Sequence, residues 1–170
     1  MAIQKQTSKQ YFRSITILYL GLLIGQLAFS AITLYLNLGL LFQPDDSLRD
    51  VFIYIVPIIV VNGFVTGQLI YRNRLKKIKN YNSLASKMGE YRGAMIIRLA
   101  MLEGASLFAI IVYLLTADLI FIAMSGLIIA YFIILRPTID KISMDLELNS
   151  TERMKIENPS EIIAEFETNM

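Results

Sequence analysis

The sequence predicts an all-α membrane protein: an antiparallel bundle of four transmembrane helices followed by a short, partly helical cytoplasmic tail. Hydrophobic residues make up 55% of the 170 residues and charged residues only 18%, which is too apolar for a soluble domain. The apolar residues also form four long blocks, at residues 15–38, 51–71, 94–116 and 119–135. A helix needs about 20 apolar residues to cross a hydrocarbon core of about 30 Å, so each block is a candidate span.

The first block is expected to remain as a transmembrane span. A secretory signal peptide has a short apolar centre and then a cleavage site of small residues, whereas residues 15–38 run on without such a site. Residues 1–14 are therefore expected to be a cytoplasmic N-terminal segment, and residues 15–136 the four-helix transmembrane domain.

The last two blocks are separated only by Ala117 and Asp118. So short a connection permits only a tight helical hairpin, which makes these two helices antiparallel neighbours. Within the second block, Pro57 is expected to kink the helix because proline removes one backbone hydrogen bond and clashes with the preceding turn.

Charged residues indicate how the chain threads the membrane. Between the second and third blocks, seven cations oppose the single acid Glu90; the cations are Arg72, Arg74, Lys76, Lys77, Lys79, Lys87 and Arg92. Cytoplasmic loops of membrane proteins carry an excess of Lys and Arg, so this connection is predicted to be cytoplasmic. Both termini must then be cytoplasmic too, and the predicted location is a bacterial inner membrane.

The same basic segment is also a candidate for contact with lipid headgroups. Clustered cations bind anionic lipid, and they also bind nucleic acid when a recognition module accompanies them. No aromatic platform or such module is visible here, so no nucleic-acid partner is expected. The predicted headgroup contacts are Arg72, Arg74, Lys76, Lys77 and Lys79.

Residues 137–170 form an acidic tail, with eight acids against three cations between residues 140 and 167. Two helix-start patterns occur in it, Asn149 followed by Glu152 and Asn158 followed by Pro159, which predict two short helices. The second would carry an apolar face of Ile162, Ile163 and Phe166. This face is interpreted either as a surface that binds a partner or the basic segment, or as a fraying terminus.

The chain contains no cysteine and no histidine. These absences exclude disulfides, thiol nucleophiles, imidazole bases and the usual ligands of zinc, copper and haem iron. The chain is therefore expected to be no enzyme and to hold no metal or cofactor.

Glu103 lies near the middle of the third block, where an ionisable side chain costs several kcal/mol unless it is neutral, paired or hydrated. It is expected to be largely protonated at neutral pH. Gln26, Asn62 and Ser125 fall at a similar depth, and Ser106 follows Glu103 on the same helix. The hypothesis for an ion-binding site comprises Glu103, Gln26, Asn62 and Ser106; the plainer interpretation is that the uncharged members form hydrogen bonds between helices.

Helical spacing arranges further polar and small residues in rows. Gln26, Ser30, Thr33 and Asn37 share one face of the first helix, and Asn62 and Thr66 share a face of the second; both rows are expected to face the bundle interior. The glycine pairs Gly21 and Gly25, and Gly63 and Gly67, are expected to let helices approach closely. Arg98 is expected to extend toward the cytoplasmic headgroups and to form no salt bridge with Glu103.

The stretch RGAMIIRLAMLEGASLFAIIVYLL, from Arg92 to Leu115, resembles the carboxylate-bearing helix of the proteolipid c subunits of rotary ATP synthases. By that resemblance Glu103 would bind a proton or a sodium ion, surrounded by Gly104, Ala105, Leu107 and Phe108. The long glycine repeat of the family's other helix is not present in residues 51–71. The whole layout, with Arg136, Pro137 and Thr138 after the last block, resembles uncharacterised small four-span bacterial membrane proteins.

These observations predict a non-enzymatic accessory, assembly or structural component of a membrane complex. The alternative is translocation of protons or sodium ions through a site at Glu103. The expected partner is the lipid bilayer, and both self-association and association with other membrane subunits are left open.

Overall fold

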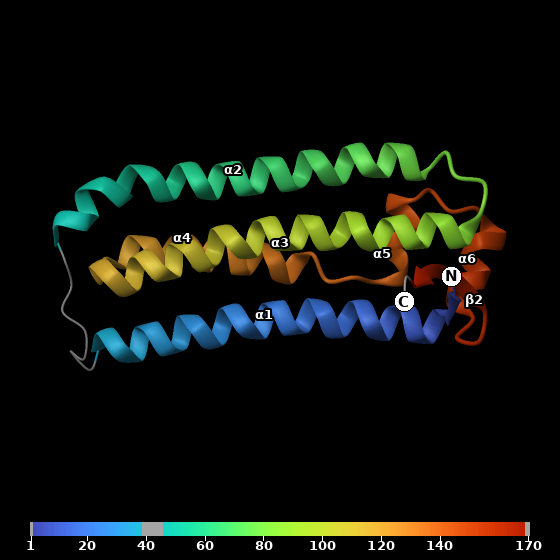
Figure 1. The fold of residues 1–170 in the computed structure, drawn as a ribbon, viewed down its shortest axis with the longest axis horizontal. Helices are drawn as coiled ribbons and strands as arrows, with labels where there is room; N and C mark the ends of the chain where they lie inside the picture. The colour runs from blue at the N-terminus through green and yellow to red at the C-terminus, as the bar shows by residue number, and fades with distance from the viewer. Residues whose placement is uncertain (1, 39–45, 169–170) are drawn as a thin grey trace. The chain divides into compact units, whose positions relative to one another are not determined.

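The computed structural model describes residues 2–38 and 46–168, and helices dominate them (Figure 1). In chain order the elements are β1 (Ala2–Thr7), α1 (Ser8–Leu38), α2 (Asp46–Ile78), α3 (Leu84–Thr116), α4 (Leu119–Ile134), α5 (Ile139–Asp145), α6 (Ser150–Glu157) and β2 (Ile162–Thr168). Helices α1, α2 and α3 are each long and apolar enough to cross a membrane, and α4 is a fourth candidate if it is counted together with α5 as one broken span. The prediction of a helical protein with membrane-length apolar helices is therefore confirmed.

The long helices extend beyond the predicted spans. Helix α1 begins at Ser8 rather than near residue 15, α2 continues through Pro57 to Ile78, and α3 begins at Leu84. The basic segment is therefore mostly helical, and only residues 79–83 connect α2 to α3. Lys and Arg are good helix formers, so a helix can continue past the point where its sequence stops being apolar.

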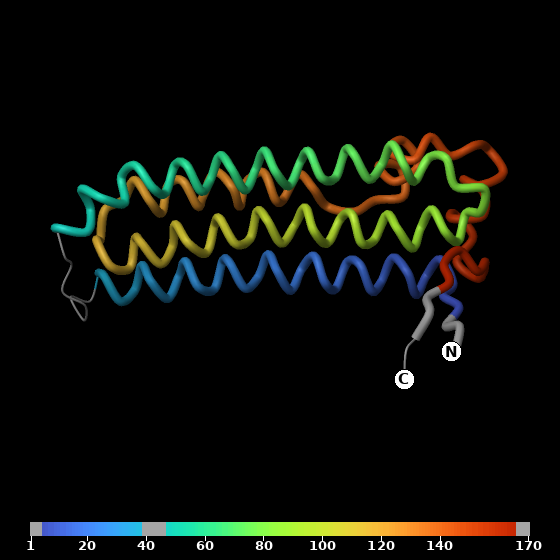
Figure 2. Tube along the Cα trace, turned by 45° about the horizontal axis from the view of Figure 1, so that its top comes forward, coloured from blue at the N-terminus to red at the C-terminus, as the bar shows by residue number. Residues whose placement is uncertain are grey.

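The chain divides into two compact units, which are described separately. The terminal unit comprises Met1–Tyr19, Leu69–Ile97 and Arg136–Met170, and the apolar unit comprises Leu20–Gln68 and Arg98–Leu135. Helices α1, α2 and α3 each contribute one part to each unit. Figure 2 shows each of these three helices as an uninterrupted helical tube. The units differ sharply in charge, because the apolar unit holds only two of the 16 Lys and Arg residues, Arg49 and Arg98.

All four long helices contribute to the core of the apolar unit. Its buried cluster comprises Val56 of α2, Ala109, Val112 and Tyr113 of α3, and Phe121 of α4, with Leu34 of α1 packed against it. In the most apolar stretch of each helix, 17% of the residues of α1 and of α2 are buried, compared with 44% for α3. Helix α3 is therefore the central helix, while α1 and α2 direct most of their apolar side chains outward.

The last segment of the tail is a strand rather than the predicted helix. Residues Ile162–Thr168 form β2, which pairs antiparallel with β1, and Ile163 and Ala164 are completely buried. The prediction of a helix starting at Asn158 is wrong because β-branched and aromatic side chains favour a strand once a partner strand is available. That partner comes from the opposite end of the chain, which no local pattern could reveal. The side chain of Phe166 lies outside the described residues.

The first predicted tail helix is confirmed as α6. The Asn149 side chain accepts a hydrogen bond from the backbone N–H of Glu152, and the Glu152 carboxylate accepts one from the backbone N–H of Asn149. This capping box satisfies donors that the start of a helix otherwise leaves unpaired. The preceding helix, α5, was not predicted from the sequence.

The acidic tail docks on the basic segment through its middle part. Lys79 donates to Glu147 at 2.6 Å, and Lys87 donates to Glu152 at 2.7 Å. The second pair is mostly buried, with the two side chains 12% and 15% exposed, whereas Glu147 is 72% exposed. The tail therefore docks on the basic segment through α6 and the turn between α5 and α6, and not through the segment after Asn158.

Acid is expected to loosen the tail through Glu152. Burial raises the pKa of this carboxyl, but hydrogen bonds from Lys87 and from the backbone N–H of Asn149 outweigh burial and hold the pKa below its ordinary value of 4.5. A carboxyl with a lowered pKa stabilises the fold fully above that ordinary value and loses this contribution as the pH falls through the lowered value. Protease sensitivity of the tail should therefore rise as the pH falls below the ordinary carboxyl pKa of 4.5.

The variant Glu152→Gln tests this expectation. It should make the tail more sensitive to protease at neutral pH and remove most of the additional loosening in acid. Its control is Glu147→Gln, which breaks an exposed ion pair worth at most about 1 kcal/mol. Equal behaviour of the two variants would show that the Lys87 pair does not hold the tail.

Candidate functional site

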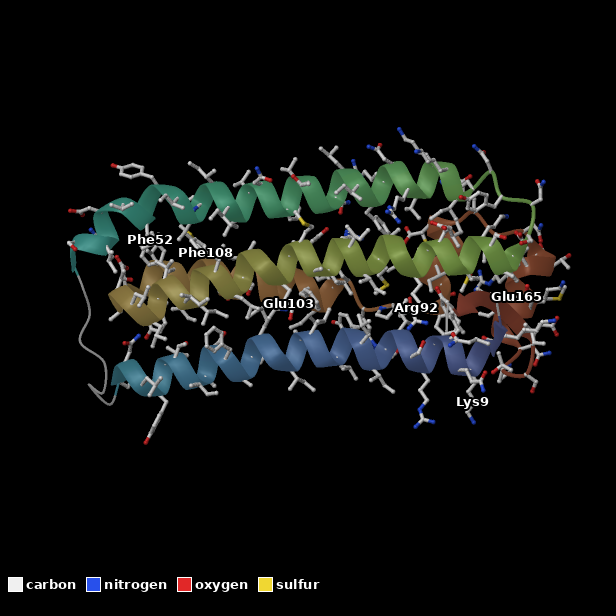
Figure 3. All side chains as sticks on the ribbon, viewed as in Figure 1. Lys9, Phe52, Arg92, Glu103, Phe108 and Glu165 are labelled. Atoms are coloured by element: carbon white, nitrogen blue, oxygen red, sulfur yellow. The ribbon has the colours of Figure 1, made fainter. Side chains whose placement is uncertain are left out.

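Glu103 lies about midway along α3, at the edge of the buried face of this helix and on the side toward α1 (Figure 3). Leu99 and Ser106, which flank it on one side of the helix, are buried, while Ala100 and Gly104 on the other side are exposed. Glu103 itself is half-buried, so it is less enclosed than the sequence suggested. Among the described residues it forms no hydrogen bond and no ion pair, and the predicted lack of a salt bridge with Arg98 holds there.

Gln26 of α1 lies level with Glu103. In the apolar unit the Asn37 side chain donates to the backbone carbonyl of Tyr113, which lies 76 residues later in the sequence. The parts of α1 and α3 within this unit run in the same direction (Figure 1). Counting back from this contact by the same number of residues on both helices places Gln26 level with Leu102, one residue from Glu103.

The polar row on α1 faces the interior, as predicted. Gln26 and Thr33 are completely buried, and Ser30 and Asn37 are half-buried. The Gln26 amide nitrogen donates to the carbonyl of Leu22 at 3.3 Å, but its Oε1 has no hydrogen-bond partner among the described residues. Ser30 Oγ and Asn37 Oδ1 also have none. A buried polar atom without a partner costs about 1–3 kcal/mol, so three in one row need an explanation.

Ser106 binds a different partner from the one expected. Its hydroxyl lies 2.8 Å from the hydroxyl of Ser125 on α4, and both side chains are completely buried. This pair is a hydrogen bond between helices, in agreement with the plainer interpretation of these residues. Ser106 is therefore not a neighbour that could complete a site at Glu103.

Asn62 does not face the interior, so this part of the prediction is wrong. Its side chain is exposed on α2 and accepts a hydrogen bond from Thr66 at 2.9 Å. The interior face of α2 is occupied by Gly63 and Gly67, where a Cβ would lie 3.0 Å from Ala105 Cβ and 3.2 Å from Met101 Cβ respectively. The close approach predicted for these glycines is thus confirmed, and it turns the adjacent Asn62 outward.

The other glycine pair does not mediate contact among the described residues. A Cβ added at Gly21 or Gly25 of α1 would meet nothing within 4 Å. The expectation that this pair brings two helices together is wrong within the chain, because the polar row of α1, which includes Gln26, occupies its inward face.

Arg98 is held inside the apolar unit instead of extending toward headgroups. Its side chain is 9% exposed, and its Nη2 donates to the Tyr131 hydroxyl of α4 at 2.7 Å. The guanidinium carbon also lies 5.9 Å from the centre of the Tyr131 ring, a distance typical of a cation–π contact. One signal for this partner was present in the sequence, since Ser125 and Tyr131 carry the only hydroxyl groups of α4.

The basic residues predicted to contact headgroups lie at the end of α2 and just after it. Lys79 is committed to Glu147, while Arg72, Arg74, Lys76 and Lys77 are exposed. Among the described residues these four form no ion pair. They remain available to anionic groups outside the chain.

The terminal unit also contains a buried pair of tyrosines that was not predicted from the sequence. The hydroxyls of Tyr71 and Tyr91 lie 2.6 and 3.2 Å from Asp145 Oδ2 and 3.1 Å from each other, and their rings pack edge to face at 6.2 Å. Burial, followed by the nearby Tyr71 and Asp145, raises the pKa of Tyr91 well above its ordinary value, so the hydroxyl stays protonated and donates. The cluster joins α5 to α2 and α3.

No protein-family model matches the chain, and no curated protein and no solved structure matches it significantly. Among the described residues, no group of three acidic side chains lies close enough together to hold a metal ion.

Proposed function

We propose that the chain is a four-span integral protein of a bacterial inner membrane, antiparallel in chain order, with both termini and the α2–α3 connection in the cytoplasm. The observation that supports this topology is the separation of charge between the two units. The parts of α1, α2 and α3 within the apolar unit cover residues 20–38, 46–68 and 98–116. At about 1.5 Å per residue these parts measure about 28 to 35 Å, which matches a hydrocarbon core of about 30 Å.

The proposed role is that of a non-enzymatic accessory or assembly component of a membrane complex. The terminal unit supports this role, because it joins both ends of the chain in one compact body through β1 and β2. It leaves four exposed cations, Arg72, Arg74, Lys76 and Lys77, free of ion pairs among the described residues. Such cations suit anionic headgroups or an acidic partner surface.

Single cysteines test this topology without background, because the chain has none. A cysteine at Tyr81, in the α2–α3 connection, should react with a membrane-impermeant reagent only from the cytoplasmic side, and a cysteine at Ser47, at the start of α2, only from the other side. Mild extraction of the membrane should then recover the chain in a complex with other subunits. Labelling of both positions from one side would contradict the topology, and recovery as a bare monomer would contradict the role.

The second candidate function is proton or sodium translocation at Glu103, as the resemblance to c subunits implies. The observation that favours it is the unpaired Gln26 Oε1, which is buried level with this carboxyl. A protonated carboxyl can donate a hydrogen bond to an amide oxygen, which an ionised carboxylate cannot.

Glu103→Gln separates the two candidate functions. For translocation, we expect proton flux into liposomes to fall at least tenfold while the melting temperature in detergent is unchanged or higher, because an amide keeps hydrogen-bonding capacity without the cost of ionisation. The matched control is Glu90→Gln, which alters the other acid of α3, an exposed one. Unchanged flux in Glu103→Gln would leave the accessory role as the better account.

A further inference from the structure

Three buried oxygens form a line along α1. Gln26 Oε1, Ser30 Oγ and Asn37 Oδ1 are separated by four and then seven residues, so they share one face of the helix. Gln26 is completely buried, and none of the three oxygens has a hydrogen-bond partner among the described residues. Apolar cavities stay dry, whereas unpaired buried polar groups are the usual sites of internal water. The line is therefore chemically suited to water molecules.

The unpaired oxygens of α1 extend from Gln26 toward one end of the apolar unit. It runs from Gln26, level with Glu103, to Asn37, one residue before the end of α1 at Leu38. Over these eleven residues it covers about 16 Å. In the other direction, Leu99 and Leu102 of α3 are almost completely buried and offer no hydrogen-bonding group.

We propose that this line is a hydrated seam along which protons reach Glu103 from the end of the apolar unit at Asn37. The inference deepens the second candidate function and rests on it. A hydronium ion at the open end would pass its proton along the water molecules, leaving neutral water behind, and the Glu103 carboxylate would take up the proton as a carboxylic acid. The seam serves protons rather than sodium ions because its oxygens are about 6 and 10 Å apart along the helix. No two of them can coordinate one cation.

Glu103 is the acid that this seam reaches. Among the described residues of the apolar unit, every other charged residue lies near a helix end or is bonded elsewhere, and the remaining titratable groups are tyrosines. The charged residues are Asp46, Arg49 and Asp50 in the first two turns of α2, Asp118 at the start of α4, and Arg98 of α3; the tyrosines are Tyr35, Tyr54, Tyr113 and Tyr131. Arg98 binds Tyr131, and Asp118 binds Arg49.

Cysteine accessibility tests whether the seam is wet. Ser30→Cys is nearly isosteric and lies on the seam, whereas Ala28→Cys, two residues earlier on the same helix, lies on the exposed outer face. In membranes, a small charged thiol reagent should modify Ser30→Cys at least ten times faster than Ala28→Cys, from the side opposite the α2–α3 connection. Equal rates, or modification of Ser30→Cys only from the side of that connection, would overturn the proposal.

Proton uptake supplies the second measurement. Asn37→Leu should slow proton flux at least tenfold and Asn37→Ser should largely restore it, whereas the control Asn62→Leu, on the exposed face of α2, should leave flux unchanged. Carbodiimide modification of Glu103 should depend on pH and not on sodium; protection by sodium at constant pH would overturn the assignment to protons. If Glu103→Gln abolishes flux but Ser30→Cys stays unreactive, the seam is refuted while the second candidate function stands.

Discussion

Tyr91→Ala is expected to destabilise the terminal unit by about 3–5 kcal/mol, the range found when large aromatic side chains are deleted from a core. Tyr91 is 2% exposed and packs edge to face against Tyr71. Its removal would leave a cavity and would also take one hydrogen-bond donor away from Asp145. Because folded domains are stable by only about 5–15 kcal/mol in total, a loss of this size should be visible as partial unfolding of the unit.

Two further variants make this prediction specific. Tyr91→Phe keeps the ring and removes only the hydroxyl, so it should cost about 1–3 kcal/mol. Tyr81→Ala removes a tyrosine that is 41% exposed in the α2–α3 connection, and its cost should stay within about 0.5 kcal/mol. The measurement is denaturant unfolding in mild detergent, together with limited proteolysis of the tail. Similar losses for Tyr91→Ala and Tyr81→Ala would show that the tyrosine cluster does not hold the terminal unit together.

The helices were predictable because the bilayer imposes a length and a composition on any segment that crosses it. The four apolar blocks predicted the four long helices. The spacings of four and three residues between Gln26 and Asn37 predicted which face of α1 points inward. This face was recognisable because it is the only polar row of an otherwise apolar helix segment. Local chemistry also identified α6, whose capping box is complete within four residues.

The orientation of α2 was not predictable in the same way. A helix in lipid is apolar on the side that faces lipid and on the side that faces its neighbours, so hydrophobic periodicity does not distinguish them. Asn62 was therefore taken to face inward, although Gly63 and Gly67 occupy that side. The pairing of β1 with β2 was missed for another reason, since it joins residues from opposite ends of the chain.

The contrast between unpaired oxygens on α1 and satisfied hydroxyls elsewhere distinguishes a site from ordinary packing. Ser106 and Ser125 satisfy each other across two helices, and Thr116 donates to the carbonyl of Val112. These hydroxyl groups have hydrogen-bond partners within the chain and do not require water. Gln26 and Asn37 each donate through their amide nitrogens, and their oxygens have no partner among the described residues, so the seam and not the serine pair has unused acceptors for water.

Gly63→Val is expected to force α2 and α3 apart. A Cβ at this position would lie 3.0 Å from Ala105 Cβ and 3.0 Å from the backbone oxygen of Met101, which is tighter than nine in ten real Cβ contacts. The Met101 oxygen belongs to the backbone of a helix and cannot swing aside as a flexible side chain would. Overpacking of a close helix contact typically costs about 1–3 kcal/mol, and valine adds two methyl groups beyond the Cβ.

Gly104→Val is the matched control, because a Cβ there meets nothing within 4 Å. Replacing a helical glycine removes a penalty of about 0.5–1 kcal/mol relative to alanine, so the control should be neutral or slightly stabilising. Gly63→Val should therefore melt in detergent at a clearly lower temperature than Gly104→Val, with Gly63→Ala between them. If both valine variants behaved alike, the close contact of α2 with α3 would not be what holds the apolar unit together. The explanation for the exposed position of Asn62 would then fail too, because we attribute that position to the tight contact of Gly63 with α3.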